Sequence, residues 1–436
     1  MSSHMHLVQM LFHSPITHTA LSWANEADGQ LEGMGDFGYW QNIARTLERG
    51  CFDAVFFADT PAASDQYKGG PETPIKFGVV WPTHDPMPLV AVMAAATKQL
   101  GIGVTLSVTG TPPYLAYRRI STLDYLSHGR IGWNVVTGHM RAEHRAIGNE
   151  LMEHDERYDM ADEYLELCRQ LWDSWDPDAV IMDRENKIFA DPAKVKTLNF
   201  KGQHYQCRGP LNVVSSPQKH PVIIMAGTSP RGQKFAVTNA DMVIAHKNSV
   251  ADMKVYSKQL RDKAAEAGRD PKSLKIFYAI KPVMADTESE AKEKWEQHLA
   301  RGDVDLGLAD LSNTLMYDMS QFDLDKPLPK DLKVQGIVGK LLQYTQSQGH
   351  LTLREIAKHE SLKETFPMYG TPEQIADILE HAWKEGGADG FHFRQMLQDY
   401  GYLVDITTKL VPVLQKRGLV RKEYTGKMLR DHLFEF

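Results

Sequence analysis

The stretch 130–166 concentrates side chains that can move protons or bind anions. Its imidazoles and guanidiniums are His139, Arg141, His144, Arg145 and His154. They lie between an apolar, β-branched run at 131–136, typical of a buried strand, and an apolar stripe with helical spacing. Such a strand, loop and helix form one βα unit, and ligands bind where the strands of these units end. We therefore predict the active site here, with His139, three residues past the strand, as the best catalytic candidate.

Two helix starts have the features of a phosphate site. His154 and Tyr158 are four residues apart, so their side chains share one helix face near free backbone N–H groups. The turn AGTSPRG at 226–232 follows a strand and opens a helix, with Gly227 allowing close backbone approach and Ser229 able to cap. Against an anion site, Tyr158 belongs to the apolar stripe and could be core. The acidic residues of the same turn would also repel an anion unless they face outward; they are Glu153, Asp155, Glu156 and Asp159.

Three further polar residues lie on or just after predicted strands. Asp59 ends the apolar run FDAVFFAD, where it would face a ligand, or else form an Asx turn or helix cap. Thr105 and Asn134 lie on the polar faces of apolar strands. A buried amide without a partner costs about 1–3 kcal/mol, so Asn134 needs either a ligand or a hydrogen bond to a neighbouring strand. Both alternatives remain open from the sequence.

Composition excludes several classes. The 436 residues carry 49 basic and 56 acidic side chains, a net charge of −7, which argues against nucleic-acid binding through a broad basic surface. No run reaches the roughly 18 apolar residues of a membrane span, and the N-terminus does not resemble a signal peptide. Three cysteines without metal-like spacing indicate neither a disulfide framework nor a metal site. We expect a cytoplasmic enzyme that binds no metal.

Apolar strands alternate with helical patterns along the whole chain. Eight strands are predicted near residues 7, 53, 101, 131, 221, 241, 275 and 390, a number that favours a closed (β/α)8 barrel. We expect a single domain spanning 1–436. Two long excursions interrupt it, an irregular one at 176–215 and a polar one at 301–366 that would serve as a lid. GxGxxG after the first strand, GxxxxGK[ST] and GxSxG are all absent, which disfavours dinucleotide-binding, P-loop and serine-hydrolase classes.

Several of these segments, in this order, resemble the bacterial-luciferase-like flavin monooxygenases. The resemblance covers about residues 7–420 and is closest to the branch of the nitrilotriacetate, EDTA, dibenzothiophene-sulfone and long-chain alkane monooxygenases. RIGWNVVT paired with HDERYD is its most specific part, whereas Met225 departs from a frequent glutamine. The matching segments are FDAVFFAD, GVTLSVT, YRRISTLDYLSHGRIGWNVVTG, HDERYDMADEYLELCRQLW and SSPQKHPVIIMAGTSPRGQKFA.

The resemblance implies a TIM barrel that oxygenates a small organic compound with O2 and reduced FMN. A separate NAD(P)H:flavin reductase would supply the FMNH2, and the chain would form a homodimer or homotetramer. A deazaflavin-dependent oxidoreductase and a non-catalytic flavin-binding protein are the alternatives. Family flavin contacts fall on Asp59, Thr105, Asn134, His154, Tyr158, Gly227, Thr228 and Ser229. His154, Tyr158 and Ser229 would hold the phosphate, and His139 would lie near the reacting face, with His18 as a second catalytic candidate.

Overall fold

Eight parallel strands close into a barrel, as predicted. The structure is a computed structural model that describes residues 4–15, 21–25, 28–79, 81–227, 229–363, 367–396 and 399–436. Around the barrel the strands follow the order β1-β14-β11-β10-β9-β4-β3-β2. They are β1 His6–Phe12, β2 Ala54–Ala58, β3 Gly101–Ser107, β4 Ile131–Val136, β9 Val222–Met225, β10 Met242–Ala245, β11 Lys275–Ile280 and β14 Gly390–Phe393.

The strands read as continuous apolar runs because both of their faces are buried. Alternate residues of each strand fill the barrel interior, among them Val8, Phe56, Ile224 and Phe277. The other face packs against the surrounding helices in one large apolar cluster. Those helices are α2 Phe37–Arg49, α4 Met87–Ala96, α5 Pro113–Leu126, α7 His154–Trp172, α8 Pro230–Asn239, α9 Val250–Glu266 and α14 Pro372–Gly386.

Helix ends follow the signals in the sequence. Asp36 caps α2 by accepting from the backbone of Gly38 at 2.8 Å. Thr371 and Gln374 form a reciprocal capping box at the start of α14. The last helical segment before the C-terminal loop consists of α15 Tyr400–Asp405, a π-helical turn Ile406–Leu410 and α16 Val411–Lys416.

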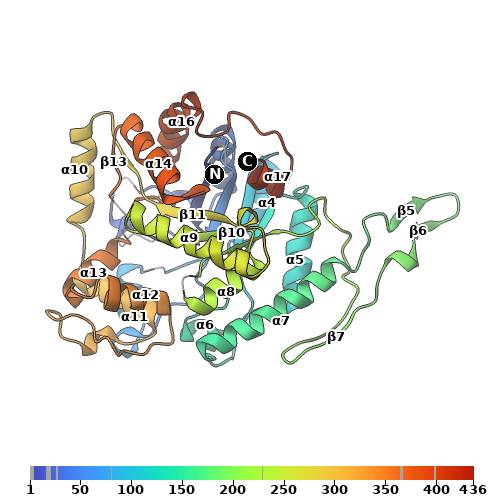
Figure 1. Ribbon diagram of the computed structural model, residues 1–436, viewed down its shortest axis with the longest axis horizontal. Helices are drawn as coiled ribbons and strands as arrows, with labels where there is room; N and C mark the ends of the chain where they lie inside the picture. The colour runs from blue at the N-terminus through green and yellow to red at the C-terminus, as the bar shows by residue number, and fades with distance from the viewer. Residues whose placement is uncertain are drawn as a thin grey trace.

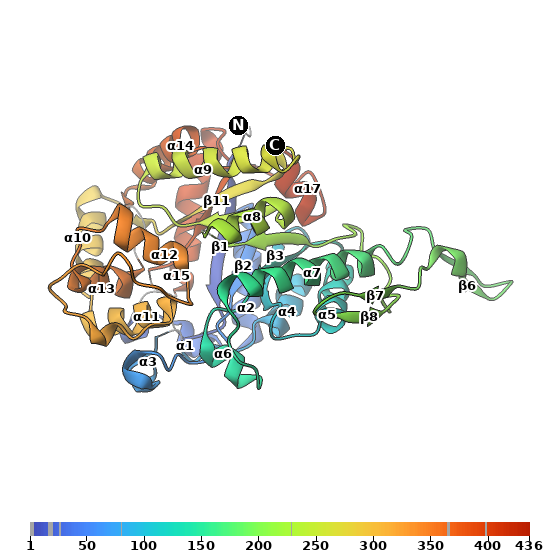
Figure 2. The ribbon, with the colours of Figure 1, turned by 60° about the horizontal axis from the view of Figure 1, so that its bottom comes forward.

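The sequence predicted an irregular first excursion at 176–215. This prediction was wrong, because the segment contains two antiparallel hairpins. One pairs β5 Val180–Asp183 with β6 Ile188–Ala190, and the other pairs β7 Asn199–Lys201 with β8 Gln206–Arg208. Strands of three or four residues are too short to show a two-residue period. The hairpin of β5 and β6 extends well away from the barrel in both ribbon views (Figures 1 and 2).

The second excursion folds around an apolar core of its own. Its helices are α11 Val304–Leu315, α12 Val338–Leu342 and α13 Leu353–Leu362. Their buried side chains cluster with Tyr67 from the segment between β2 and α4. In Figures 1 and 2 these helices and α6 Arg141–Ala146 lie at the end of the molecule away from both chain termini. This is the end where the barrel strands finish, and we call it the mouth.

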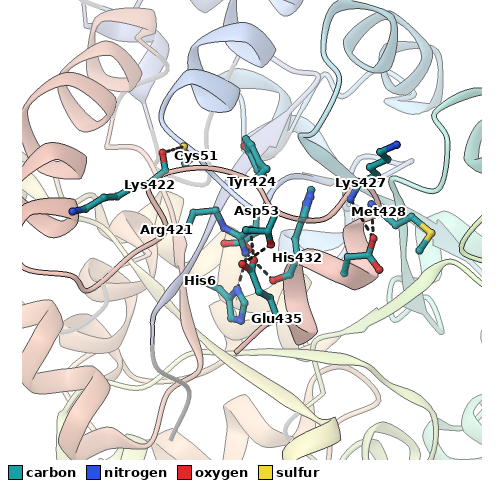
Figure 3. A network of polar contacts seen from close by, with 12 residues as sticks. His6, Cys51, Asp53, Arg421, Lys422, Tyr424, Lys427, Met428, His432 and Glu435 are labelled. Atoms are coloured by element: carbon teal, nitrogen blue, oxygen red, sulfur yellow. Dashed lines mark hydrogen bonds and ion pairs between the residues drawn. The ribbon is translucent and has the colours of Figure 1, made fainter.

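The opposite end of the barrel is closed by the C-terminal segment. Helix α17 Leu429–Phe434 inserts Leu429 and Leu433 into the barrel interior. Beside it, the Asp53 carboxylate accepts from the Arg421 guanidinium at 2.6 Å and contacts the His6 ring at 2.9 Å (Figure 3). Because this buried ionic network lies at the base of the strands, it supports the fold rather than the site.

Candidate active site at the barrel mouth

Thr105 and Asn134 are paired residues on adjacent strands near the mouth. The Asn134 amide nitrogen donates to the Thr105 hydroxyl at 2.8 Å, and this hydroxyl donates to the carbonyl of Phe57 at 2.8 Å. The internal hydrogen bond considered from the sequence is therefore present. It uses only half of the amide, however, because Asn134 Oδ1 is buried and has no hydrogen-bond partner in the described part of the chain. An unsatisfied acceptor at the end of a barrel strand is suited to a ligand N–H.

Asp59 follows β2 directly and so lies at the mouth. Burial raises the pKa of its carboxyl to about 6, and the nearby charge of Asp85 raises it further, against a backbone hydrogen bond from Thr60. A carboxyl with such a pKa exchanges protons near neutral pH, which is frequent among functional groups.

His139 lies three residues beyond β4, as the sequence suggested. Burial lowers the pKa of its imidazole to about 4, and the positive charges of Arg157 and Lys363 lower it further. The ring is therefore neutral at physiological pH. The following residues form the short helix α6 instead of the loop expected from their polarity. Arg145 on this helix is exposed to solvent and lies 3.6 Å from Asp65.

Glu143 on α6 is a site residue that the sequence did not suggest. Burial raises the pKa of its carboxyl to about 7, and the charge of Asp59 also raises it, while Arg157 acts to lower it. The Glu143 and Asp59 carboxyls thus interact across the mouth. A glutamate within a polar helix carries no sequence signal for such burial, since it becomes buried only through packing.

The predicted phosphate residues converge where α7 and α8 meet. Ser229 caps α8 by accepting from the backbone of Gly232 at 3.0 Å, and the Tyr158 hydroxyl forms a hydrogen bond with Ser229. A methyl group at Gly232 would lie 2.8 Å from the Tyr158 hydroxyl and 3.0 Å from Ser229 Oγ. Both hydroxyls therefore lie over the first turn of α8, where free N–H groups favour an anion. The His154 ring lies tilted against the Tyr158 ring, with ring centroids 5.2 Å apart.

The acidic residues of this turn face away from the hydroxyls. Glu153, Asp155, Glu156 and Asp159 are all exposed. Asp155 contacts His154 Nδ1 at 2.6 Å, and Asp159 pairs with Arg231 at 2.8 Å. The repulsion that argued against an anion site is thereby removed. Tyr158 in turn has both roles considered from the sequence, because its ring packs against Phe235 of the core while its hydroxyl reaches Ser229.

Arg157 is a second residue that the sequence did not suggest. Its side chain is only 1% exposed, yet its guanidinium donates to two backbone carbonyls, Met152 O at 2.6 Å and Gln335 O at 3.2 Å. It therefore ties the second excursion to the start of α7. Its place inside HDERYD, between His154 and Tyr158, was the available signal. Two other candidates, His18 and Thr228, lie outside the described residues.

Comparison with known proteins identifies the family. Residues 17–390 match the family model described as luciferase-like monooxygenase. The chain is 39% identical to a dibenzothiophene-sulfone monooxygenase of Rhodococcus erythropolis (strain XP), over 98% of this chain and 96% of the relative. This chain belongs to the luciferase-like monooxygenase family.

Other relatives of this luciferase-like monooxygenase extend the range of named substrates. It is 35% identical to nitrilotriacetate monooxygenase component A of Aminobacter aminovorans, over 91% of this chain and 90% of the relative. The crystal structure of a riboflavin lyase with modified FMN and riboflavin matches 99% of this chain and 96% of that one, with 29% identity and a TM-score of 0.91. The protein is a flavin-dependent monooxygenase that uses O2.

The residues at the mouth fit a flavin on two independent observations. Asn134 Oδ1 is a buried acceptor without a described partner, which suits an N–H of the ring system. The hydroxyls of Tyr158 and Ser229 converge over an N-terminal helix turn that a side chain at Gly232 would fill, which suits a phosphate. The buried amide of Asn134 and the turn at Ser229 thus lie on adjacent βα units, because β4 and β9 are neighbours in the barrel.

Proposed function

We propose that this protein is the oxygenase component of a two-component system that acts on a small organic compound with reduced FMN and O2. The convergence of the Tyr158 and Ser229 hydroxyls over the start of α8 carries this proposal, because it suits the phosphate that distinguishes FMN from riboflavin. Its substrate would be a xenobiotic that contains sulfur, nitrogen or halogen, as in the relatives named for dibenzothiophene sulfone and nitrilotriacetate.

In this proposal the residues divide into three groups. His154, Tyr158 and Ser229 bind the phosphate, and Gly227 and Thr228 are assigned to the cofactor from the family resemblance. Asp59, Thr105 and Asn134 contact the ring system. His139 and His18 lie near the substrate.

Reduced FMN supplies two electrons when bound, so that one oxygen atom of O2 enters the substrate and the other leaves as water. The protein's part is to exclude water and to manage protons. His139, neutral because its pKa is about 4, offers one ring N–H and one acceptor nitrogen to the reacting oxygen. Glu143 and Asp59, with pKa values of about 7 and 6, can hold and return a proton near neutral pH. The second excursion covers the mouth as a lid.

The phosphate assignment is tested by comparing FMN with riboflavin, which lacks only the phosphate. Charge-assisted hydrogen bonds contribute about 1.5–3 kcal/mol, so Ser229→Ala and Tyr158→Phe should each raise the Kd for FMN about tenfold or more. The Kd for riboflavin should stay the same. Tyr125→Phe, at a tyrosine on α5 that is 48% exposed, is the matched control. Equal losses for both flavins, or no loss for FMN, would overturn the phosphate assignment.

The catalytic proposal is tested by turnover with a flavin reductase as the source of FMNH2. Dibenzothiophene sulfone, nitrilotriacetate, halogenated aromatics and alkanes form the first substrate panel. His139→Ala should lower the product formed per FMNH2 oxidised, with the balance of O2 appearing as hydrogen peroxide. Unchanged coupling would exclude His139 from the mechanism. Turnover with chemically reduced FMN, at the rate seen with the reductase, would show that flavin diffusion suffices without docking.

Assembly as a homodimer or homotetramer is also proposed, and the projecting hairpin supports it. Ile181, Met182, Ile188 and Phe189 of β5 and β6 are between 45% and 60% exposed on this hairpin (Figure 1). Exposed apolar residues gathered on one projecting element are a frequent feature of protein interfaces. A double variant, Ile188→Ser with Phe189→Ser, should shift the mass measured by light scattering toward the monomer. An unchanged mass would exclude this hairpin as the interface.

Location in the cytoplasm remains a proposal. No helix in the described part of the chain is both long and apolar enough to cross a membrane. The described cysteines, Cys51, Cys168 and Cys207, are all free thiols, which is consistent with a reducing compartment. Fractionation of the native host would test it.

A further inference from the structure

Arg394 and His246 form a basic pair at the mouth. Arg394 directly follows β14 and His246 directly follows β10, the two strands that flank β11. The Arg394 guanidinium contacts His246 Nε2 at 2.7 Å. Arginine has no acceptor, so the nitrogen of His246 must accept this hydrogen bond. The histidine is therefore neutral, with its proton on Nδ1, and it orients the guanidinium while keeping one N–H for another group.

More positive charge surrounds this pair. Burial lowers the pKa of His246 well below its ordinary value, and the charges of Arg394, Lys340 and Lys363 lower it further. Lys340 and Lys363 come from the second excursion, which thus presents cations toward the barrel. The positive charge of each lysine is partly balanced by a carboxylate, because Lys340 lies 2.7 Å from Glu360 and Lys363 pairs with Asp310. Neighbouring protein groups thus desolvate the His246 ring, but residue 246 keeps part of its surface exposed and Arg394 is half-buried, so both can be reached from solvent.

The carboxyls at the mouth cancel part of this charge. The pKa of Asp59 is raised to about 6 and that of Glu143 to about 7, so Asp59 is mostly ionised and Glu143 only about half ionised at neutral pH. Arg157 adds a further cation, and it bonds to backbone carbonyls in place of a carboxylate. Cations gathered among protein groups attract an anion more strongly than they would in open solvent.

Barrel topology places Arg394 across the mouth from Asn134. In the closed order of strands, β14 is four strands from β4 in either direction, and these two strands are therefore opposite. Arg394 follows β14 on one wall of the mouth, and Asn134 lies on β4 in the opposite wall. A compound bound by Arg394 would lie between that wall and the residues proposed to contact the flavin ring.

We propose that Arg394, oriented by His246, binds an anionic group of the substrate, a carboxylate, sulfinate or sulfonate. This inference rests on the proposed function and narrows its substrate class to small organic anions. A guanidinium matches two oxygens of such a group with two parallel N–H donors. The Nδ1–H of His246 adds a third donor beside them.

A matched pair of probes tests the charge requirement. Naphthalene-2-sulfonate is anionic at pH 7.5, whereas naphthalene-2-sulfonamide has nearly the same shape and is neutral. We expect calorimetry with the full-length protein to show at least about tenfold tighter binding of the sulfonate. Arg394→Met should abolish this preference by weakening the sulfonate alone, and Arg394→Lys should retain part of it. Arg45→Met, at an exposed arginine on α2, is the control and should change nothing.

Further outcomes separate this inference from the proposed function. Equal affinity for both probes in the wild type, or an unchanged sulfonate affinity in a folded Arg394→Met variant, would overturn the anion site. Loss of FMN affinity in Arg394→Met, with riboflavin unaffected, would also overturn it, because Arg394 would then hold the cofactor's phosphate. Failure of the proposed function would appear separately, as a Kd for FMN that does not change in Tyr158→Phe or Ser229→Ala. Thermal unfolding of each variant confirms that it is folded before its binding is compared.

Discussion

Replacing Arg421 with methionine should destabilise the base of the barrel in a pH-dependent way. Arg421 is 5% exposed and donates to Asp53 at 2.6 Å, to the carbonyl of His432 at 2.7 Å and to Glu435 at 2.9 Å. Figure 3 shows Arg421, Asp53, His432 and Glu435 gathered close together. Methionine keeps much of the side-chain volume but leaves the Asp53 carboxylate without its main cation.

The magnitude follows from the pKa of Asp53. Burial acts to raise this pKa, but Arg421 and His6 outweigh burial and lower it from 3.8 to about 2. At about 1.36 kcal/mol per pKa unit, the network favours the ionised form by about 2.4 kcal/mol. Removing one partner of a buried pair costs about 3–5 kcal/mol, because the remaining charge stays buried. We therefore expect Arg421→Met to lower the free energy of unfolding at pH 7 by about 3–4 kcal/mol.

The sign of the pH dependence is a stricter test. A depressed carboxyl pKa stabilises the fold above pH 3.8, and this contribution is lost as the pH falls toward 2. Without Arg421, burial should raise the pKa of Asp53 above 3.8. The gap between wild type and variant should therefore narrow as the pH is lowered from 7 to 4. Urea denaturation followed by tryptophan fluorescence at several pH values measures this gap.

Two comparisons complete the test. Arg417→Met removes an arginine of an exposed pair, 2.6 Å from Asp377, and should cost at most about 1 kcal/mol at any pH. Adding Asp53→Asn to Arg421→Met should recover part of the loss, because the unpaired charge disappears. The reasoning fails if Arg421→Met costs less than about 1 kcal/mol at pH 7, or if its effect does not depend on pH.

Three further predictions concern the mouth. Gly232→Ala should weaken FMN binding by about tenfold and leave riboflavin binding unchanged, because its methyl group would displace the hydroxyls of Tyr158 and Ser229. Equal weakening of FMN and riboflavin binding would instead indicate a general disruption of the site. Arg157→Met should release the second excursion by removing the bond to Gln335, seen as faster hydrogen exchange across α11–α13 with β1–β4 unaffected. Asp59→Asn should stabilise the fold at pH 8 by about 1–3 kcal/mol, because the raised carboxyl pKa of about 6 makes ionisation costly, and this gain should vanish below pH 4.

The barrel could be predicted from the sequence because both faces of its strands are buried. The run at 131–136 matches β4 residue for residue, and β14 begins at residue 390, where a strand was predicted. Such runs are bounded by glycine or charged residues, and helix caps such as Asp36 mark the elements between them. Such local patterns predict the strands and helices even when the tertiary contacts are unknown.

Segments that depend on distant contacts could not be predicted. Helix α17 is six residues long and exists because Leu429 and Leu433 fill the base of the barrel. The core of the second excursion depends on Tyr67, more than 200 residues earlier in the chain. Glu143 and Arg157 are ordinary charged helix residues in sequence, and only packing shows that they are buried or partly buried. The sequence therefore predicted the site residues that lie at strand ends. It did not predict those, such as Glu143 and Arg157, whose burial depends on packing against other segments.

Asp53 and Asp59 show most directly what sequence cannot provide. They flank the same strand, β2, yet the pKa of Asp53 is lowered to about 2 and that of Asp59 is raised to about 6. At the base, Arg421 compensates the buried charge and stabilises the fold. At the mouth, burial disfavours charge on Asp59, Glu143 and His139 alike. A fold that disfavours the charged forms of ionisable groups at one end forgoes stability there, which is the expected cost of a site that must bind and protonate. Asparagine at the two positions should accordingly change stability in opposite directions at neutral pH.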